Sequence, residues 1–178
     1  DAVKRRPIRH VMINTNGVRI AQDPEFVARL ASYAPRLEVY LQFDSRDDDA
    51  LMDLRGARLS RIRQQALEAL EAAGLATTLV VVVKKGVNDR EIPDIIRHAL
   101  TWTCVRGVTF QPIQHAGRAE DFDPAVNRLT LTEVRRRILE QSPVFAPADV
   151  VPVPCNPDCL AMAYALKQGG ELVPLTRY

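Results

Sequence analysis

Short apolar runs alternate with longer segments of helical periodicity along most of the chain. Each run ends in a cluster of polar residues, as in the sequences VMINTNG, VYLQFDS, LVVVVKKGVND and VTFQPIQHAGR. Polar residues at the end of a strand that precedes a helix are typical of βα units, which carry their chemistry at the carboxyl ends of the strands. The pattern therefore predicts an α/β protein and indicates an enzyme.

Strands are predicted over residues 9–13, 37–43, 77–83 and 105–112. The run at 77–83 is continuously β-branched or apolar, as expected for a parallel strand that is covered on both faces. A closed barrel needs eight βα units, and only about four are present. We therefore predict an open, partial parallel βα barrel and expect further units ahead of Asp1.

Helices are predicted between these strands. Asp23 and Pro24 supply an N-cap and a first-turn proline for a helix to about residue 34. An apolar stripe predicts the most regular helix, which ends at Gly74; it consists of Leu59, Ile62, Ala66, Leu70 and Ala73. The acidic residues 45–54 are predicted to form a loop.

The later part of the chain gives further end signals. Asn88 or Asp89 is predicted to cap a helix that runs to about residue 102. The sequence Thr-Leu-Thr-Glu at 130–133 predicts a capping box. Residues 143–157 are rich in proline and end the βα pattern, and a short helix over 159–167 and a strand over 171–175 are expected to follow.

Composition narrows the class of protein. A chain of 178 residues with 47% hydrophobic residues fits one globular unit. Its longest apolar stretch, residues 79–83, is far shorter than the roughly 18 residues of a membrane span, and residues 1–9 lack the apolar core of a signal peptide. We expect a cytoplasmic protein. The net charge of +2 is too balanced to indicate a nucleic-acid partner.

Several short motifs occur in a fixed order at the ends of the predicted strands. They are Thr15-Asn16-Gly17, Gln42-Phe43-Asp44, Lys85-Gly86-Val87-Asn88-Asp89 with Glu91, and Gln111-Pro112 with Gly117-Arg118. In order and spacing the chain resembles the later strands of a radical S-adenosylmethionine (SAM) enzyme. The resemblance extends over about residues 11–159. It is closest to the molybdenum-cofactor cyclase-like and tetraether lipid synthase-like subgroups.

The resemblance implies SAM and a [4Fe–4S] cluster as cofactors of the intact enzyme. Such an enzyme would form a 5′-deoxyadenosyl radical and act on an organic substrate, which for the lipid synthase-like subgroup would be a lipid. Neither the CxxxCxxC motif nor a GGEP-like element occurs in the sequence. The chain therefore resembles the C-terminal part of the barrel, expected to be inactive alone and to need the missing N-terminal half as a partner. Residues 1–142 would hold the later βα units, and residues 143–178 an extension packed on them.

The carboxyl ends of the predicted strands converge on one edge, and the resemblance implies that the polar residues at the Gln42–Asp44 strand end bind the ribose or the methionine carboxylate of SAM. The candidate cofactor-binding residues on this edge are Asn14, Thr15, Asn16, Gln42, Asp44, Asn88 and Gln111, and Lys84, Gln114 and His115 share it. Each has a structural alternative. Asn16 with Gly17 is a common turn, and Asp44 and Asn88 are good helix or loop caps. Gln42 and Gln111 are flanked by apolar residues, so their amides need partners if they are buried.

Two cysteines are candidate metal ligands. Cys155 and Cys159 lie four residues apart in a proline-stiffened segment, and two thiolates so spaced can bind one metal ion or cluster. The lipid synthase-like resemblance implies an auxiliary iron–sulfur cluster, which would need ligands from elsewhere. Cys104 is predicted to lie in the core. Structural roles are predicted for His10 and His98, whereas His115 is predicted to face solvent, a metal or a substrate anion.

Two other functions fit the same sequence. A degenerate half-barrel could serve as a non-catalytic binding or scaffold domain, and its exposed sheet edge would favour self-association. A βα-barrel lyase fragment would use Lys84 or Lys85 as a Schiff-base amine, which requires Lys84 to be desolvated. Adjacent lysines followed by Gly86 instead favour a solvated loop.

Overall fold

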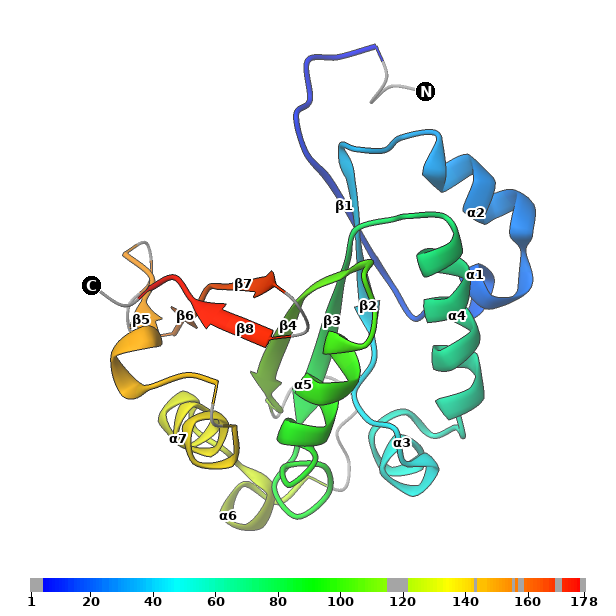
Figure 1. Ribbon diagram of the computed structural model, residues 1–178. Coiled ribbons are helices and arrows are strands. Elements are labelled where there is room, and N and C mark those ends of the chain that lie inside the picture. The colour runs from blue at the N-terminus through cyan, green and yellow to red at the C-terminus, as the bar shows by residue number, and fades with distance from the viewer. Residues whose placement is uncertain are drawn as a thin grey trace. The chain divides into compact units, whose positions relative to one another are not determined.

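The computed structural model describes residues 5–114, 122–142, 144–154, 156, 159–168 and 171–176. These residues form two compact units (Figure 1). The N-terminal unit comprises the described residues up to Val82 together with Ile95–Gln111. The C-terminal unit comprises Val83–Asp94 and the described residues from Pro112 onward. The predicted boundary between residues 142 and 143 stays a prediction, since these units divide the chain elsewhere.

The strands of the main sheet are β1 (Val11–Thr15), β2 (Leu37–Gln42), β3 (Thr77–Val83) and β4 (Val105–Pro112). They form one four-stranded sheet in the order β1-β2-β3-β4. β2 pairs in parallel with both β1 and β3, and Val39 lies opposite Ile13 on one side and Thr77 on the other. Sequential parallel order confirms the predicted α/β fold, and within the described residues the sheet is an open partial barrel.

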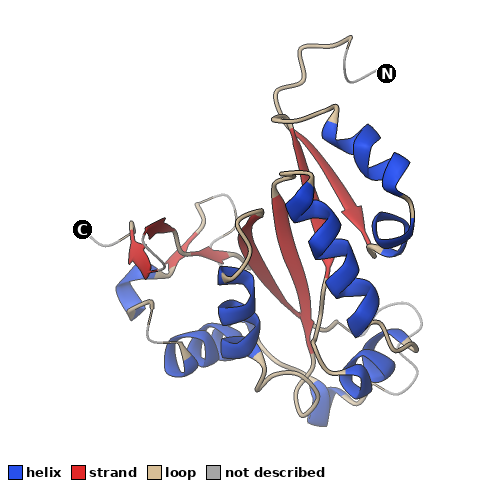
Figure 2. Ribbon diagram, turned by 45° about the vertical axis from the view of Figure 1, so that its right-hand side comes forward, coloured by secondary structure: helices blue, strands red, loops and turns tan. Residues whose placement is uncertain are grey.

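Helices connect the strands. They are α1 (Val18–Gln22), α2 (Pro24–Ala31), α3 (Asp48–Arg55), α4 (Ser60–Ala72) and α5 (Ile92–Leu100). Figure 2 shows the long helix α4 running alongside the sheet. The predicted N-cap of α2 is confirmed, because the Asp23 carboxylate accepts a hydrogen bond of 2.8 Å from the Phe26 amide. α5 begins at Ile92, later than predicted, so Asn88 and Asp89 precede its first turn.

One face of the sheet forms the core of the N-terminal unit. Alternate residues of β2 and β3 are at most 3% exposed on this face, and they include Leu37, Val39, Leu41, Thr77, Leu79 and Val81. A Cβ atom built on Gly17 would meet both Leu41 of β2 and Ala66 of α4, so this face lies against α4. The burial of β3 on both faces confirms its predicted environment.

The predicted loop at 45–54 is wrong, because α3 begins there at Asp48. Asp47 caps α3 by accepting from the Asp49 amide, and Asp48 and Asp49 occupy its first turn. Carboxylates are favourable at the positive end of a helix dipole. The acidic run therefore marks the start of a helix.

The C-terminal unit contains α6 (Pro124–Asn127), α7 (Leu131–Gln141), a 3₁₀ turn (Pro147–Asp149), β5 (Val151–Pro152), β6 (Ala161–Met162), β7 (Ala165–Gln168) and β8 (Glu171–Pro174). The predicted capping box of α7 is confirmed between Thr130 and Glu133. β5 with β6 and β7 with β8 form antiparallel pairs. The strand predicted at 171–175 is confirmed as β8.

The predicted helix over 159–167 is wrong, because these residues contribute to β6 and β7 instead. The sequence Ala-Met-Ala-Tyr-Ala-Leu alternates small and large side chains with a period of two. That period fits a strand, although alanine favours a helix by intrinsic propensity. Pairing with β5 and β8 decides the outcome.

Candidate functional site

The face of the sheet opposite the core carries a row of polar side chains. Asn14 of β1 lies opposite Tyr40 of β2, and Gln42 follows Tyr40 on the same face because side chains alternate along a strand. Asn14 is exposed, whereas Tyr40 and Gln42 are half-buried. An open sheet face with amide and phenol groups near the carboxyl ends of parallel strands can hydrogen-bond a polar small molecule.

A carboxylate on this face is held in place by its neighbours. Glu38 accepts a hydrogen bond of 2.6 Å from the Thr78 hydroxyl on β3, and its other oxygen lies 3.3 Å from His10 Nε2. The Glu38 side chain is 19% exposed. The structural role predicted for His10 agrees with this contact. Glu38 was not predicted, because it lies near the amino end of β2 and not at the carboxyl end.

Asp44 lies just beyond the end of β2 and is completely buried. Arg55 of α3 donates two hydrogen bonds to its carboxylate, from Nε to Oδ2 at 2.7 Å and from Nη2 to Oδ1 at 2.9 Å. The Val82 amide donates to Oδ1 at 3.1 Å. These contacts tie the end of β2 to β3 and α3. Asp44 thus has a positioning role, and its predicted contact with SAM stays a prediction.

A second arginine extends this network toward β1. Arg63 of α4 is 1% exposed; its Nη1 donates to the Asn16 carbonyl, and its Nη2 lies 3.6 Å from Asp44 Oδ2. The side-chain hydrogen bond to Asp44 raises the pKa of Arg55, whereas burial lowers the pKa of Arg63. One buried carboxylate and two guanidinium groups therefore fix the ends of β1 and β2.

The turn after β1 is closed by its own polar side chains. Thr15 Oγ1 accepts from the Gly17 amide at 3.1 Å, and Asn16 Oδ1 accepts from the Val18 amide at 3.2 Å. These bonds show the structural role that the sequence left open for Asn16. Asn16 is exposed.

Phe43, the residue before Asp44, belongs to a group of aromatic side chains. The ring of Phe43 stacks on His98 of α5 at 5.5 Å, and Trp102 Nε1 donates to His98 Nε2 at 3.3 Å. Burial, with a smaller effect from the positive charge of Arg46, lowers the pKa of His98. His98 is therefore neutral at pH 7 and accepts through Nε2, in agreement with its predicted structural role.

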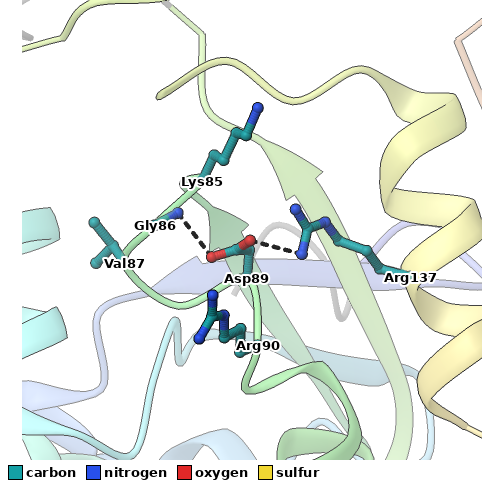
Figure 3. Close-up of a pocket in the computed structure, with 6 residues that line it drawn as sticks. All are labelled: Lys85, Gly86, Val87, Asp89, Arg90 and Arg137. Carbon is teal, nitrogen blue, oxygen red and sulfur yellow. Dashed lines mark hydrogen bonds and ion pairs between the residues drawn. The ribbon is translucent and has the colours of Figure 1, made fainter. Parts of the chain in front are cut away.

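The loop after β3 belongs to the C-terminal unit. Asn88 is 1% exposed, and its Oδ1 accepts from the Lys84 amide at 2.9 Å. Lys84 is buried at 8% exposure while Lys85 is exposed, so the expected solvated loop is wrong for Lys84 and right for Lys85. Figure 3 shows Lys85 and its neighbours around a pocket.

The two described thiols do not form a cluster site by themselves. Cys104 is buried as predicted, and burial together with Glu71 raises the pKa of its thiol to about 12. Cys159 is exposed, whereas Cys155 and His115 lie outside the described residues. Within the described part of the chain, no group of three or more His, Cys, Asp or Glu side chains is placed to bind a metal ion.

The strand ends bring together some of the predicted residues. Asn14, Thr15, Asn16, Gln42 and Asp44 all lie at the carboxyl ends of the paired strands β1 and β2. Gln111 is exposed near the end of β4. Their binding of a cofactor stays a prediction. The sequence analysis did not predict Arg55, Arg63 or Glu38 as part of the site.

An open parallel sheet with polar groups at its strand ends defines an α/β enzyme of the βα-barrel type. The family model of the Radical SAM superfamily matches residues 1–99, which is more than half of the 178 residues, so the chain belongs to this superfamily. Enzymes of this superfamily use SAM and a [4Fe–4S] cluster. The predicted family is thereby confirmed, with SAM and a [4Fe–4S] cluster as its cofactors, whereas the auxiliary cluster stays a prediction.

Curated relatives share this family. The chain is 28% identical over 95% of its length to a 7,8-dihydro-6-hydroxymethylpterin dimethyltransferase of Methanocaldococcus jannaschii, of which it spans 38%. It is 30% identical over 71% of its length to a GTP 3′,8-cyclase of Rhizobium meliloti, of which it spans 34%. A GTP 3′,8-cyclase of Brucella canis is 27% identical over 83% of the chain. The chain thus spans well under half of these relatives.

None of the helices in the described ranges has the length and apolar character needed to cross a lipid bilayer. The predicted cytoplasmic location stays a prediction.

Proposed function

We propose that this chain supplies one wall of the SAM and substrate site of a radical SAM enzyme. The observation that carries the proposal is the polar sheet face, where Asn14, Tyr40 and Gln42 lie together on paired strands. Amide and hydroxyl groups in this arrangement can bind the ribose hydroxyls and the amino-acid end of SAM. Asn16, Asn88 and Gln111 are further candidates at strand ends. Asp44 positions the end of β2 through its hydrogen bonds with Arg55 and the Val82 amide.

The step that generates the radical requires residues that this sequence does not contain. The 178 residues include no CxxxCxxC motif, and the described thiols do not form a cluster site. We therefore propose that the chain acts together with a cluster-binding segment, in the same polypeptide or in another. On its own the chain is expected to leave SAM intact.

The substrate is proposed from the names of the relatives. Pterin and guanine both contain a 2-amino-4-oxopyrimidine ring, and relatives are named for reactions of a pterin and of GTP. An amide side chain such as that of Gln42 can donate to the oxo group and accept from the amino group of such a ring. A fused pyrimidine heterocycle is therefore the substrate class that these observations favour.

A lipid chain is the second candidate. Leu166 of β7 lies opposite Val173 of β8, and both are about half exposed at 51% and 47%. Exposed apolar side chains on one hairpin face are compatible with an apolar ligand. Turnover assays with a dihydropterin, with GTP and with a long-chain lipid distinguish the two classes, since only the correct class yields 5′-deoxyadenosine together with a consumed substrate.

The SAM site is tested by binding measurements on the enzyme that contains its cluster-binding segment. Replacing Gln42 with Ala should weaken SAM binding by roughly 1–3 kcal/mol, the cost of losing a hydrogen bond to a charged or buried group. Gln22→Ala is the matched control, because Gln22 is an exposed residue of α1. Equal affinity of Gln42→Ala and wild type would remove Gln42 from the site.

We also propose that Cys155 and Cys159 bind an auxiliary iron–sulfur cluster in the assembled enzyme. Cys159 is exposed and therefore accessible to iron. Replacing both cysteines with Ser should lower the iron content after anaerobic reconstitution, while Cys104→Ser should leave it unchanged because Cys104 is buried with a thiol pKa raised to about 12. Unchanged iron in the double variant would make these cysteines structural.

A further inference from the structure

A pocket of about 410 Å³ lies within the C-terminal unit, between the loop after β3 and helix α7. Its lining residues are Lys85, Gly86, Val87, Asp89, Arg90 and Arg137 (Figure 3). This volume falls in the range of about 300–1,000 Å³ that is usual for pockets that bind small molecules. The pocket is rich in cations, since three of the six lining residues are Lys or Arg.

Hydrogen bonds fix the shape of the loop. Asn88 Oδ1 accepts from the Lys84 amide at 2.9 Å, and Asp89 Oδ1 accepts from the Gly86 amide at 2.8 Å. The Val87 amide donates to the Lys84 carbonyl at 3.1 Å. Gly86 has a φ of +80°, a conformation that glycine adopts without strain. The backbone that carries Lys85 is thus pre-organised.

The only carboxylate among the lining residues is already engaged on both oxygens. Asp89 Oδ1 accepts from the Gly86 amide, and Asp89 Oδ2 lies 2.7 Å from Arg137 Nη1. Asp89 is 6% exposed in its side chain and Arg137 is 19% exposed, so this pair forms the inner wall. In Figure 3 the Asp89 carboxylate lies between Gly86 and the Arg137 guanidinium.

The remaining cations have no ionic partner within the described residues. Lys85 and Arg90 are exposed, and neither forms an ion pair there. Lys85 contributes to lowering the pKa of Glu133, but hydrogen bonds from Thr130 to Glu133 Oε2 are the main cause of that shift, and Glu133 is not one of the lining residues. The charge of the lining residues is therefore three positive and one negative, a surplus of two.

The guanidinium of Arg137 also has hydrogen-bonding capacity left. Its Nη1 pairs with Asp89, and its side chain remains 19% exposed. An oxyanion is the kind of acceptor that an arginine binds most strongly. Asp89 keeps this guanidinium oriented by holding its Nη1.

We propose that Lys85, Arg90 and Arg137 form a binding site for the phosphoryl group of a small molecule. The surplus of two positive charges matches the charge of a phosphate monoester dianion, whereas a single carboxylate would leave one cation without a partner. Arg supplies a planar fork of donors and Lys a compact point charge, and both bind phosphate oxygens. None of the lining residues is among those proposed to bind SAM, so the site stands independently of the radical chemistry.

The site is tested by titrating the protein with inorganic pyrophosphate in a calorimeter at low ionic strength. Lys85→Gln/Arg90→Gln should bind pyrophosphate at least about tenfold more weakly than wild type, because it loses two charge-assisted contacts. Both positions are exposed, so the fold should be retained, which far-UV circular dichroism verifies. Binding to wild type should also weaken as salt is added.

The matched control is Arg29→Gln/Arg61→Gln. Arg29 and Arg61 are exposed on α2 and α4, and neither forms an ion pair in the described part of the chain. Both double variants lower the net charge of +2 by two, so a general charge effect changes them equally. The control should bind pyrophosphate within about twofold of wild type.

Three results would overturn the proposal. One is that wild type fails to bind pyrophosphate, and another is that the two double variants lose affinity equally. The third is that citrate, a tricarboxylate whose charge near pH 7 is close to that of pyrophosphate, binds wild type as tightly as pyrophosphate does. Selective loss in Lys85→Gln/Arg90→Gln, with weak citrate binding, supports a phosphoryl site.

Discussion

Arg55 donates two hydrogen bonds, of 2.7 and 2.9 Å, to the carboxylate of Asp44. The backbone of Asp44 has a φ of +62°. Few residues other than glycine adopt this left-handed conformation, and Asp and Asn do so more readily than most. The carboxylate also accepts from the Val82 amide. A strained backbone is therefore held by a buried charge at the carboxyl edge of the sheet.

Substituting Asp44 should show these two contributions separately. Asp44→Ala loses the charge and strains the left-handed backbone, so we expect unfolding to become easier by roughly 3–5 kcal/mol. Asp44→Asn keeps a side chain that tolerates this conformation and should cost about 1 kcal/mol less than Ala. Urea unfolding followed by circular dichroism measures both values.

Arg58→Gln is the control for this comparison. Arg58 pairs with Asp49 at 2.9 Å, but their side chains are 63% and 79% exposed. Exposed pairs contribute little, so its unfolding free energy should stay within about 0.5 kcal/mol of wild type. If Asp44→Ala were no more damaging than Arg58→Gln, the buried network would not stabilise the sheet edge.

Gly17 is confined both by its backbone and by its neighbours. It has a φ of +78°, and an added Cβ would lie 2.6 Å from Leu41 Cδ1 and 3.2 Å from Ala66 Cβ. Gly17→Ala should therefore destabilise the protein by about 2–4 kcal/mol, through backbone strain and crowding together.

Gly56→Ala separates these two effects. Gly56 also has a left-handed φ of +69°, but no atom lies within 4 Å of its added Cβ. Strain alone should cost about 1 kcal/mol there. Thermal and urea unfolding of the two variants give the comparison, and equal losses would show that contact with Leu41 and Ala66 costs nothing.

Glu71 of α4 should make the free energy of unfolding depend on pH in the acidic range. Hydrogen bonds from Thr103, and then from Cys104, lower the pKa of Glu71 to about 2 from an ordinary value of 4.5. A lowered carboxyl pKa gives stability that is present above pH 4.5 and is lost as the pH falls toward 2. Because the group is largely solvated, we expect only about 1 kcal/mol from it.

Glu71→Gln measures this contribution. The variant should be less stable than wild type at pH 6, and the difference should shrink as the pH falls through the interval between 4.5 and 2. Unfolding free energies at several pH values provide the test. A difference that stays constant down to pH 2 would contradict the hydrogen-bonded, ionised state of Glu71.

The sequence predicts β3 well because its burial on both faces leaves a continuous apolar signal. β4 also has the predicted bounds, although it is the last strand in the sheet order and is only partly buried. The predictions for segments 45–54 and 159–167 were wrong because each segment carries two sequence signals that favour different structures. Acidic residues indicate a loop and also favour a helix start, and alanine favours a helix although the period of two fits a strand.

The position of polar residues at strand ends predicted Asn14 and Gln42 at the carboxyl edge of the sheet, but it did not predict the buried residues that hold this edge in place. Arg63 lies four residues after Leu59 and three before Ala66, which puts it on the apolar side of α4. A charged residue on such a face requires a buried partner, and this was the available signal. Its partner Asp44 is 19 positions away in the sequence, so only the tertiary fold identifies the pair.

The fluorescence of Trp102 should report the protonation state of His98. It is the single tryptophan of the chain, and its Nε1 donates to His98 Nε2 at 3.3 Å. Burial lowers the pKa of His98, so the neutral imidazole accepts this bond at pH 7. Protonation places a hydrogen on Nε2 and breaks the bond, so the tryptophan fluorescence should change with a midpoint below 6.5, the ordinary histidine value.

The sign of the linked stability follows from the same shift. A histidine whose pKa is lowered by folding stabilises the protein above pH 6.5, and this contribution is lost as the pH falls through its lowered pKa. His98→Gln should abolish the fluorescence transition, whereas His10→Gln should retain it because His10 pairs with Glu38 and not with the tryptophan. A midpoint at or above 6.5 in wild type would show that burial does not disfavour the charged imidazole, and would leave the stacking of His98 on Phe43 as its main contact in the core.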